Sequence, residues 1–226
     1  MSRGLAFLLT TLVCITASAQ QNDLFYRLEL GGGLGAGFNL TDVSNDIGLA
    51  ASAIARFPLN PRMAVKTQFT YFPMKGSTKT TAFYPATTLN ATDQQLDYKV
   101  NDAIYDLSAL FELHFLPYGY EKNYQGNFRI TPYIQAGLGL AYGPAGESFT
   151  INIPLGIGLK YKIAPRLNLG LDWTFHLSLS DKLDGLDAPV GIESTEFRNK
   201  DHYTAIQLTL TYDLCPKCPT CNKDDD

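Results

Sequence analysis

The segment LNLGLDWTFHLSLS, residues 167–180, decides the fold because its side chains alternate in character along its whole length. Large apolar residues, namely leucine, tryptophan and phenylalanine, occupy the odd positions. The even positions carry small or polar residues: Asn168, Gly170, Asp172, Thr174, His176, Ser178 and Ser180. A period of two sustained over this length predicts a β-strand with one apolar face and one polar face.

Seven other segments show the same alternation, and each is long enough to form a strand. They are Phe25–Phe38, Leu49–Phe57, Met63–Phe72, Ile104–Leu116, Ile130–Tyr142, Ile151–Ile163 and His202–Leu214. Strands of soluble proteins are usually about 5–6 residues long, whereas a strand that crosses a membrane at a tilt needs about 9–11. Backbone groups in lipid must all be paired, so the sheet has to close. The sequence therefore predicts an all-β fold, an eight-stranded antiparallel transmembrane up-and-down β-barrel.

The connections between these strands alternate in length. Leu59–Pro61 and Ala164–Arg166 are tight turns and Pro117–Asn127 is moderate, whereas residues 39–48, 73–103, 143–150 and 181–201 form longer loops. Outer-membrane barrels have short periplasmic turns and longer outer loops, so both termini are expected in the periplasm. Outward aromatic residues are expected to form a girdle at each end, with Tyr26, Phe57, Phe115, Tyr161 and Tyr212 at the periplasmic end and Phe38, Tyr71, Tyr105, Tyr142 and Phe175 at the outer end.

The N-terminus predicts export. Arg3, the apolar run Leu5–Ile15 and the sequence Ala17-Ser18-Ala19 are typical of a secretory signal peptide. We expect a signal peptide at residues 1–19, a barrel at 20–214 and a short periplasmic tail at 215–226. The formal net charge of −4 gives no indication of a nucleic-acid partner.

The polar faces of the strands carry charges of both signs in equal number. The predicted inward residues are Arg27, Arg56, Lys66, Lys160 and Lys162, with Glu29, Asp106, Glu112, Asp172 and Asp213. Eight strands enclose only enough space for side chains, and buried charges must be paired. These residues therefore predict a lumen filled by an ion-pair network, and they argue against a selective pore.

The three histidines do not predict catalysis. His114 is expected near the periplasmic end and His202 near the outer end, facing lipid or its boundary. His176 points inward beside Ser178 and Asp172, but residues two apart on a strand face are about 7 Å apart, which is too far for a nucleophile and its base. We expect no catalytic residue, cofactor or metal ion, and a hydrolase at the outer rim that uses His176 is the weakest of three functional hypotheses.

The order of several segments resembles that in the PorG-type proteins of Bacteroidetes. The segments are FPLNPRMAVKTQFTYFP (57–73), ELHFLPYG (112–119), RITPYIQAGLGLAY (129–142), INIPLGIGLKYKIAPRLNLGLDWTF (151–175), SDKLDGL (180–186) and NKDHYTAIQLTLTYDLCP (199–216). The resemblance covers residues 25–216 and includes no catalytic motif.

The resemblance implies a role in type IX secretion. PorG-type proteins are outer-membrane barrels associated with a periplasmic ring made by the PorK lipoprotein and its partner PorN. On this basis we expect a non-enzymatic anchor in the outer membrane, with a PorK-like and a PorN-like protein as partners. The alternative is a structural or adhesive barrel that binds an extracellular ligand through its outer loops, of which residues 76–97 form the longest.

The tail LCPKCPTC, residues 214–221, contains Cys215, Cys218 and Cys221. Its prolines favour polyproline II, in which cysteines three apart have Cα atoms about 9 Å from each other, whereas a disulfide needs them within about 7 Å. We therefore expect the three thiols to tether a periplasmic partner, with a mixed disulfide as one mechanism. A local Cys-x-x-Cys disulfide with one spare thiol, and an adventitious metal site that includes Asp224–Asp226, remain as alternatives.

Overall fold

A computed structural model describes residues 26–40, 47–77, 99–120, 127–180, 183 and 200–216. The predicted signal peptide, Cys218 and Cys221 lie outside these residues. The described strands are β1 (Tyr26–Leu40), β2 (Gly48–Asn60), β3 (Met63–Ser77), β4 (Lys99–His114), β5 (Ile130–Gly143), β6 (Ser148–Ala164), β7 (Leu167–Ser178) and β8 (His202–Pro216). No helix among the described residues is long and apolar enough to cross a membrane.

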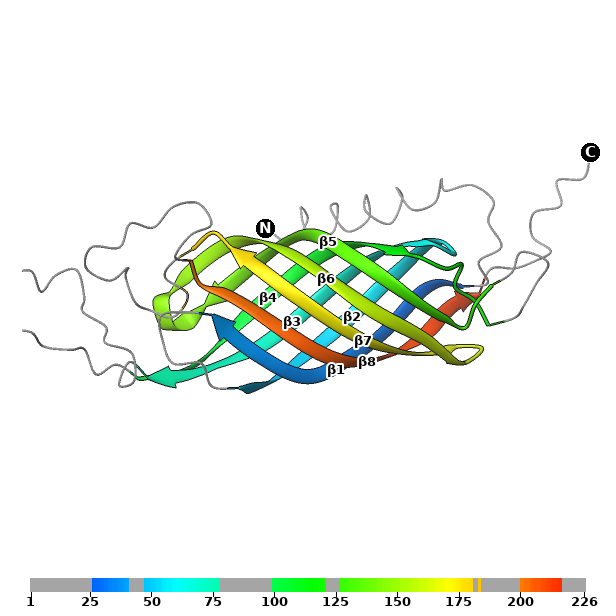
Figure 1. Ribbon diagram of the computed structural model, residues 1–226. Helices are drawn as coiled ribbons and strands as arrows, with labels where there is room; N and C mark the ends of the chain where they lie inside the picture. The colour runs from blue at the N-terminus through cyan, green and yellow to red at the C-terminus, as the bar shows by residue number, and fades with distance from the viewer. Residues whose placement is uncertain are drawn as a thin grey trace, which may run out of the picture.

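The eight strands form one closed sheet in chain order (Figure 1). Each strand pairs antiparallel with its neighbours, and β1 closes the barrel on β8 from Tyr26 opposite Pro216 to Leu40 opposite His202. Closure pairs the backbone of every strand on both sides, so no edge is left open. The predicted eight-stranded antiparallel up-and-down barrel is confirmed.

Some strands are longer than their side-chain pattern indicates. The β3–β4 ladder continues to Ser77 opposite Lys99, well beyond the predicted end at Phe72. Pro73 interrupts the alternation in the sequence, yet it lies opposite Ala103 within the ladder. At the other end of the barrel, β8 continues through Cys215 to Pro216, so the first two residues of the predicted tail belong to the last strand.

The two ends of the barrel differ, and we name them by their connections. The turn end holds the connections β2–β3, β4–β5 and β6–β7 together with Tyr26 and Pro216, the first and last described residues of the barrel. The loop end holds the four other connections, including the 3-10 helix η3 (Pro144–Gly146) between β5 and β6. In Figure 1 the turn end lies on the right.

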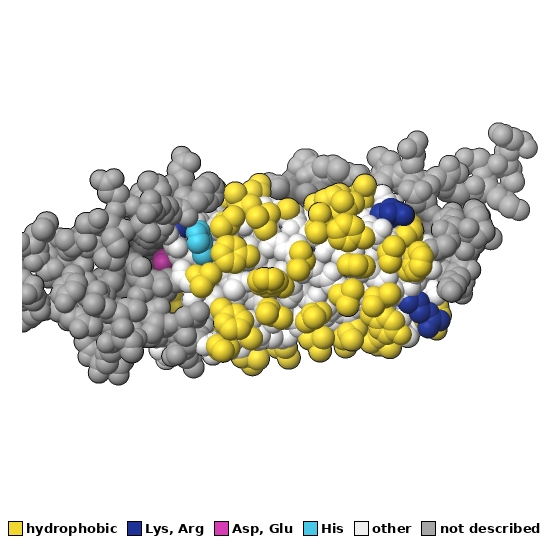
Figure 2. Space-filling view, in the orientation of Figure 1, with side chains coloured by type: hydrophobic (Ala, Val, Ile, Leu, Met, Phe, Trp, Pro, Cys, Tyr) yellow, Lys and Arg dark blue, Asp and Glu magenta, His cyan; other side chains and the backbone are white. Residues whose placement is uncertain are grey.

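The outer wall of the barrel is apolar around the described strands. Leu34, Leu138 and Leu208 are each more than half exposed, and Phe69, Phe111 and Trp173 lie on the same outer surface. Figure 2 shows hydrophobic side chains across the visible face between the two ends. A soluble monomer rarely exposes an apolar patch of more than a few hundred Å². The wall therefore suits the hydrocarbon of a bilayer.

Glycines on the inner face of β1 allow the strands to approach closely. A Cβ atom at Gly35 would overlap the backbone carbonyl oxygen of Ile206 on β8, whereas one at Gly37 would lie 3.3 Å from the Cβ of Ala50. Backbone atoms of a closed sheet cannot move aside as a side chain can. Gly35 is thus required by the barrel's closure, and Gly37 is not.

We expect Gly35→Ala to lower the free energy of unfolding by about 1–3 kcal/mol, the usual cost of overpacking. Gly37→Ala on the same strand is the matched control and should cost less, because the nearest atoms to its added Cβ are side-chain atoms, Ala50 Cβ at 3.3 Å and Phe72 Cδ1 at 3.4 Å. Urea unfolding in lipid vesicles measures both, with the fluorescence of Trp173, the sole tryptophan, as the signal. Equal losses in the two variants would contradict this account of β1.

Candidate functional site

Nine of the ten predicted lumen residues are buried inside the barrel. These are Glu29, Arg56, Lys66, Asp106, Glu112, Lys160, Lys162, Asp172 and Asp213. Arg27 is exposed, so the expectation that it belongs to the lumen is wrong. Arg27 lies two residues before Glu29 and therefore points to the same side of β1. The β1–β2 ladder begins only at Glu29, however, so Arg27 lies beyond the enclosed part of the barrel.

Six of these charged side chains, each from a different strand, form one chain of contacts across the lumen: Lys160, Glu29, Arg56, Glu112, Lys66 and Asp172. Lys160 Nζ lies 2.5 Å from Glu29 Oε1, and Arg56 Nη1 lies 2.8 Å from Glu29 Oε2. Lys66 Nζ lies 3.4 Å from Glu112 Oε1 and 3.1 Å from Asp172 Oδ2. Opposite charges alternate along the chain, which couples six strands through one network.

Arg56 is the centre of this chain because it binds two carboxylates at once. Its Nε donates to Glu112 Oε2 at 2.7 Å and its Nη2 to Glu112 Oε1 at 3.0 Å, while Nη1 binds Glu29. A guanidinium group holds a carboxylate by two parallel hydrogen bonds, which fixes direction as well as charge. Removing Arg56 would leave two carboxylates facing each other without water.

Asp106 forms a separate cluster nearer the loop end. Its Oδ2 accepts hydrogen bonds from Asn152 Nδ2 at 2.6 Å and from Tyr203 Oη at 2.8 Å, and Ser108 donates to its Oδ1. His176 Nδ1 lies 3.5 Å from Asp106 Oδ2. With Arg27 outside, four cations face five carboxylates, and Asp106 is held by hydrogen-bond donors, with His176 Nδ1 also 3.3 Å from Asn152 Oδ1.

The structure places His176 in the lumen among hydrogen-bonding partners that come from other strands. The neighbour of its ring is Asp106 on another strand, and Asp172 instead pairs with Lys66 and accepts a hydrogen bond from Tyr133. The His176 ring stacks on Tyr203 at 4.6 Å between centroids, and the residue is 2% exposed. A substrate at the rim has no access to it.

An apolar cluster closes the lumen at the loop end. It comprises Ala50, Phe72, Met74, Ile104, Ala141, Leu183, Tyr203 and Ala205. Leu183 comes from the β7–β8 connection, is fully buried, and donates its backbone N–H to Asp201 Oδ2 at 2.8 Å. Paired charges on one side and this cluster on the other leave no open path through the described lumen.

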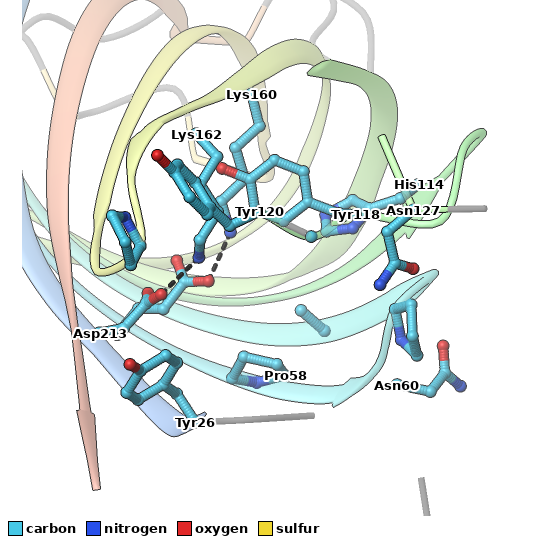
Figure 3. Close-up of a pocket in the computed structure, with 15 residues that line it drawn as sticks. Tyr26, Pro58, Asn60, His114, Tyr118, Tyr120, Asn127, Lys160, Lys162 and Asp213 are labelled. Carbon is cyan, nitrogen blue, oxygen red and sulfur yellow. Dashed lines mark hydrogen bonds and ion pairs between the residues drawn. The ribbon is translucent and has the colours of Figure 1, made fainter. Parts of the chain in front are cut away.

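The turn end, in contrast, contains a pocket of about 150 Å³ (Figure 3). Its walls are tyrosines and prolines: Tyr26, Pro58, Pro61, Tyr118, Tyr120 and Pro165. Lys160 and Lys162 lie beneath, with their Nζ atoms 4.5 and 5.3 Å from the centre of the Tyr118 ring. Lys160 is paired with Glu29 and Lys162 with Asp213, so the charges that line the pocket cancel.

Tyr118 fixes the turn-end segment over the lumen. Its hydroxyl donates to Asn168 Oδ1 at 2.8 Å, and Asn168 also accepts from Lys162 and donates to Asp213. Burial raises the pKa of Tyr118 well above its usual range, and the negative charge of Glu29 acts in the same direction. The phenol therefore remains a neutral hydrogen-bond donor.

Two buried polar side chains in the pocket keep atoms without a hydrogen-bond partner, namely the ring nitrogens of His114 and Oδ1 of Asn127. His114 Nε2 nevertheless lies 3.5 Å from Glu112 Oε2, which is within ion-pair distance. Both line the same side of the pocket in Figure 3, and they are 5% and 8% exposed. The expectation that His114 faces lipid is wrong, because it shares the inward parity of Glu112. An unpaired buried polar atom costs about 1–3 kcal/mol, which makes this pair unusual.

The rim of the turn end is basic among the described residues. Arg27, Arg62, Arg129 and Arg166 are all exposed there, and the described acidic side chains of this end, Glu29 and Asp213, are buried and paired. Arg129 lies over the Tyr120 ring at 4.1 Å, and Arg166 lies over the Tyr26 ring at 5.2 Å. The pocket thus opens within a ring of guanidinium groups.

Of the predicted tethering cysteines, only Cys215 lies in the described part of the chain. It is exposed, carries a free thiol and has a left-handed backbone with φ of 54°. Among the described residues, no group of three or more His, Cys, Asp and Glu side chains is arranged to hold a metal ion.

We expect Arg56→Leu to lower the free energy of unfolding by about 3–5 kcal/mol, because breaking a buried ion pair leaves its partners uncompensated. Arg27→Leu removes the same charge from an exposed position and should cost less than about 0.5 kcal/mol. The Trp173 urea assay measures both variants. Similar small losses would show that the chain of ion pairs contributes no stability.

Three solved structures of bacterial proteins share the overall course of the chain at low sequence identity. Neisserial surface protein A is 11% identical, with a TM-score of 0.48 over 83% of this chain and 97% of that one. The attachment invasion locus protein of Yersinia pestis, bound to the heparin analogue sucrose octasulfate, is 11% identical, with a TM-score of 0.46 over 84% of this chain and 100% of that one. The N-terminal barrel of Pseudomonas aeruginosa OprF is 13% identical, with a TM-score of 0.39 over 81% and 97%.

No curated protein sequence matches the chain. A family model does, and it spans residues 5–213, which include every strand of the closed barrel up to Asp213. The apolar wall and the filled lumen are consistent with that match. The chain belongs to the outer membrane protein β-barrel domain family.

Proposed function

We propose that this outer-membrane barrel is a non-enzymatic anchor for a periplasmic assembly, and that the assembly is the PorK-like and PorN-like ring of type IX secretion. The observation that carries the anchoring role is the sealed lumen, since Lys66, Glu112 and Asp172 at its centre are at most 1% exposed. A barrel whose described lumen is filled by paired side chains is expected to act through its ends. The link to type IX secretion rests on the resemblance to PorG-type proteins.

Under this proposal the turn end faces the periplasm. Short turns are typical of the periplasmic side of outer-membrane barrels, and the described chain ends there at Pro216. The tail that carries the three cysteines would then begin at the periplasmic surface of the outer membrane, where a ring protein can reach it. Cys215 is already exposed at this point.

Reconstituted into a planar lipid bilayer, the protein should give no ion conductance. Its lumen is filled by paired charges and closed by apolar side chains, so ions find no hydrated path. The matched control is a porin in the same bilayer. Reproducible conductance steps from the purified chain would refute the sealed-lumen argument and reopen the pore hypothesis.

The anchoring role is tested in the host by comparing four strains: unaltered, lacking the whole chain, truncated after Pro216, and lacking residues 79–97. Each strain is assayed for export of a type IX cargo and for recovery of the ring lipoprotein with the barrel. We expect export to fail without the chain, to fall on truncation, and to persist when only the long loop is removed. The loop deletion leaves β3 and β4 intact.

A second comparison addresses the covalent tether. Membranes from the unaltered strain and from a Cys215/Cys218/Cys221→Ser strain are run on a non-reducing gel. A mixed disulfide gives a high-mass band that disappears on reduction and in the serine strain.

Normal export without the chain would refute the secretion role. Loss of surface attachment on removal of residues 79–97 would instead favour an adhesive barrel.

A further inference from the structure

The turn-end pocket has the chemistry of a receptor for polypeptide. Three tyrosines and three prolines form its walls, and aromatic-lined grooves of this kind bind proline-containing extended segments. His114 Nδ1 and Asn127 Oδ1 lack hydrogen-bond partners, and a ligand that brings N–H or O–H donors would pair with both atoms. Its own charges cancel, so that ligand should be uncharged where it enters.

The chain's own C-terminal tail begins at this pocket. Pro216 lies opposite Tyr26 in the β1–β8 ladder, and both Tyr26 and Asp213 line the pocket. Cys215 has a left-handed backbone, so the chain bends at this residue, near the end of β8 and beside the turn-end pocket. Ten residues follow Pro216, and at about 3.3 Å per residue they span up to about 33 Å, enough to cross the mouth.

The order of residue types in the tail matches the order of features around the pocket. Cys218–Asn222 is an uncharged stretch that contains a proline and supplies backbone N–H groups. Lys223 separates this stretch from Asp224–Asp226, and the exposed Arg27, Arg62, Arg129 and Arg166 of the rim can meet these three carboxylates. A guanidinium group can hold a carboxylate by two parallel charge-assisted hydrogen bonds.

We propose that the tail docks on its own barrel, with Cys218–Asn222 in the turn-end pocket and Asp224–Asp226 against the arginine rim. Docking gives His114 and Asn127 their missing partners and covers the thiols of Cys218 and Cys221. In the isolated chain the tail is then bound to the barrel, and a partner reaches the thiols only by displacing the tail. This inference concerns the isolated protein and stands whether or not the ring is the partner.

The test is the rate at which a maleimide alkylates Cys218 in the folded barrel, with Cys215 and Cys221 changed to serine. The same rate in a synthetic peptide of residues 214–226 provides the unprotected reference. We expect the barrel to slow alkylation about tenfold, the factor that corresponds to ~1.4 kcal/mol of docking free energy.

Two sets of substitutions separate the pocket from the rim. The first set, His114→Phe with Asn127→Leu, removes the unpartnered atoms of the pocket. The second set, Asp224/Asp225/Asp226→Asn, removes the tail's charges and leaves the barrel untouched. Each set should return the alkylation of Cys218 to the peptide rate. The control is Gln135→Leu, which removes an unpartnered buried oxygen elsewhere in the lumen and should retain the protection.

Alkylation of Cys218 at the peptide rate in the unaltered chain overturns the proposal. Protection that persists in both variant sets overturns it as well, because the tail would then be covered by something other than the pocket and rim. These measurements use purified protein without partners, so their failure leaves the anchoring role standing. Failure of the export assay likewise leaves tail docking standing.

Discussion

The pairing of charge inside a space without water is the constraint on which the rest of the structure depends. A closed barrel of eight strands has a lumen that side chains fill, and each ion placed there loses its hydration. Arg56 meets this constraint by binding Glu29 and Glu112 together, which ties β2 to β1 and β4. Because the partners come from strands far apart in sequence, their charges are compensated only when the sheet has closed in the correct register.

The sequence was sufficient to predict the fold because a membrane wall imposes a strict period of two. Leucine and phenylalanine on one face and small or polar residues on the other identify each strand without any knowledge of its partners, as residues 167–180 show. The boundaries were less predictable where a ladder continues past the apolar band, as β3 does through Pro73 to Ser77. Beyond the lipid, the outward residues need not be apolar, so the pattern fades while the hydrogen bonds continue.

The site was only partly predictable, for a geometric reason. Parity identified which charges point inward, but it does not show where the enclosed space begins, which is why Arg27 was placed in the lumen. Nor does it show which strands meet across the lumen, so the proximity of His176 to Asp106 on β4 cannot be predicted from the alternation alone. The same parity that predicts Glu112 inside would have placed His114 inside as well. The pocket itself has no periodic signal, because Tyr118 and Asn127 belong to a connection.

The sealed interior and the open turn end follow from one arrangement. Ion pairs that fill the centre of the barrel cannot extend to the mouth, where water competes for the same groups and the strands no longer enclose them. Lys160 and Lys162 lie at this boundary, paired on the inner side and facing the Tyr118 ring on the other. What remains at the mouth is a neutral, aromatic pocket with unsatisfied polar atoms and a basic rim. The unpartnered polar atoms of His114 and Asn127 therefore lie at the end of the barrel where β1 begins and β8 ends.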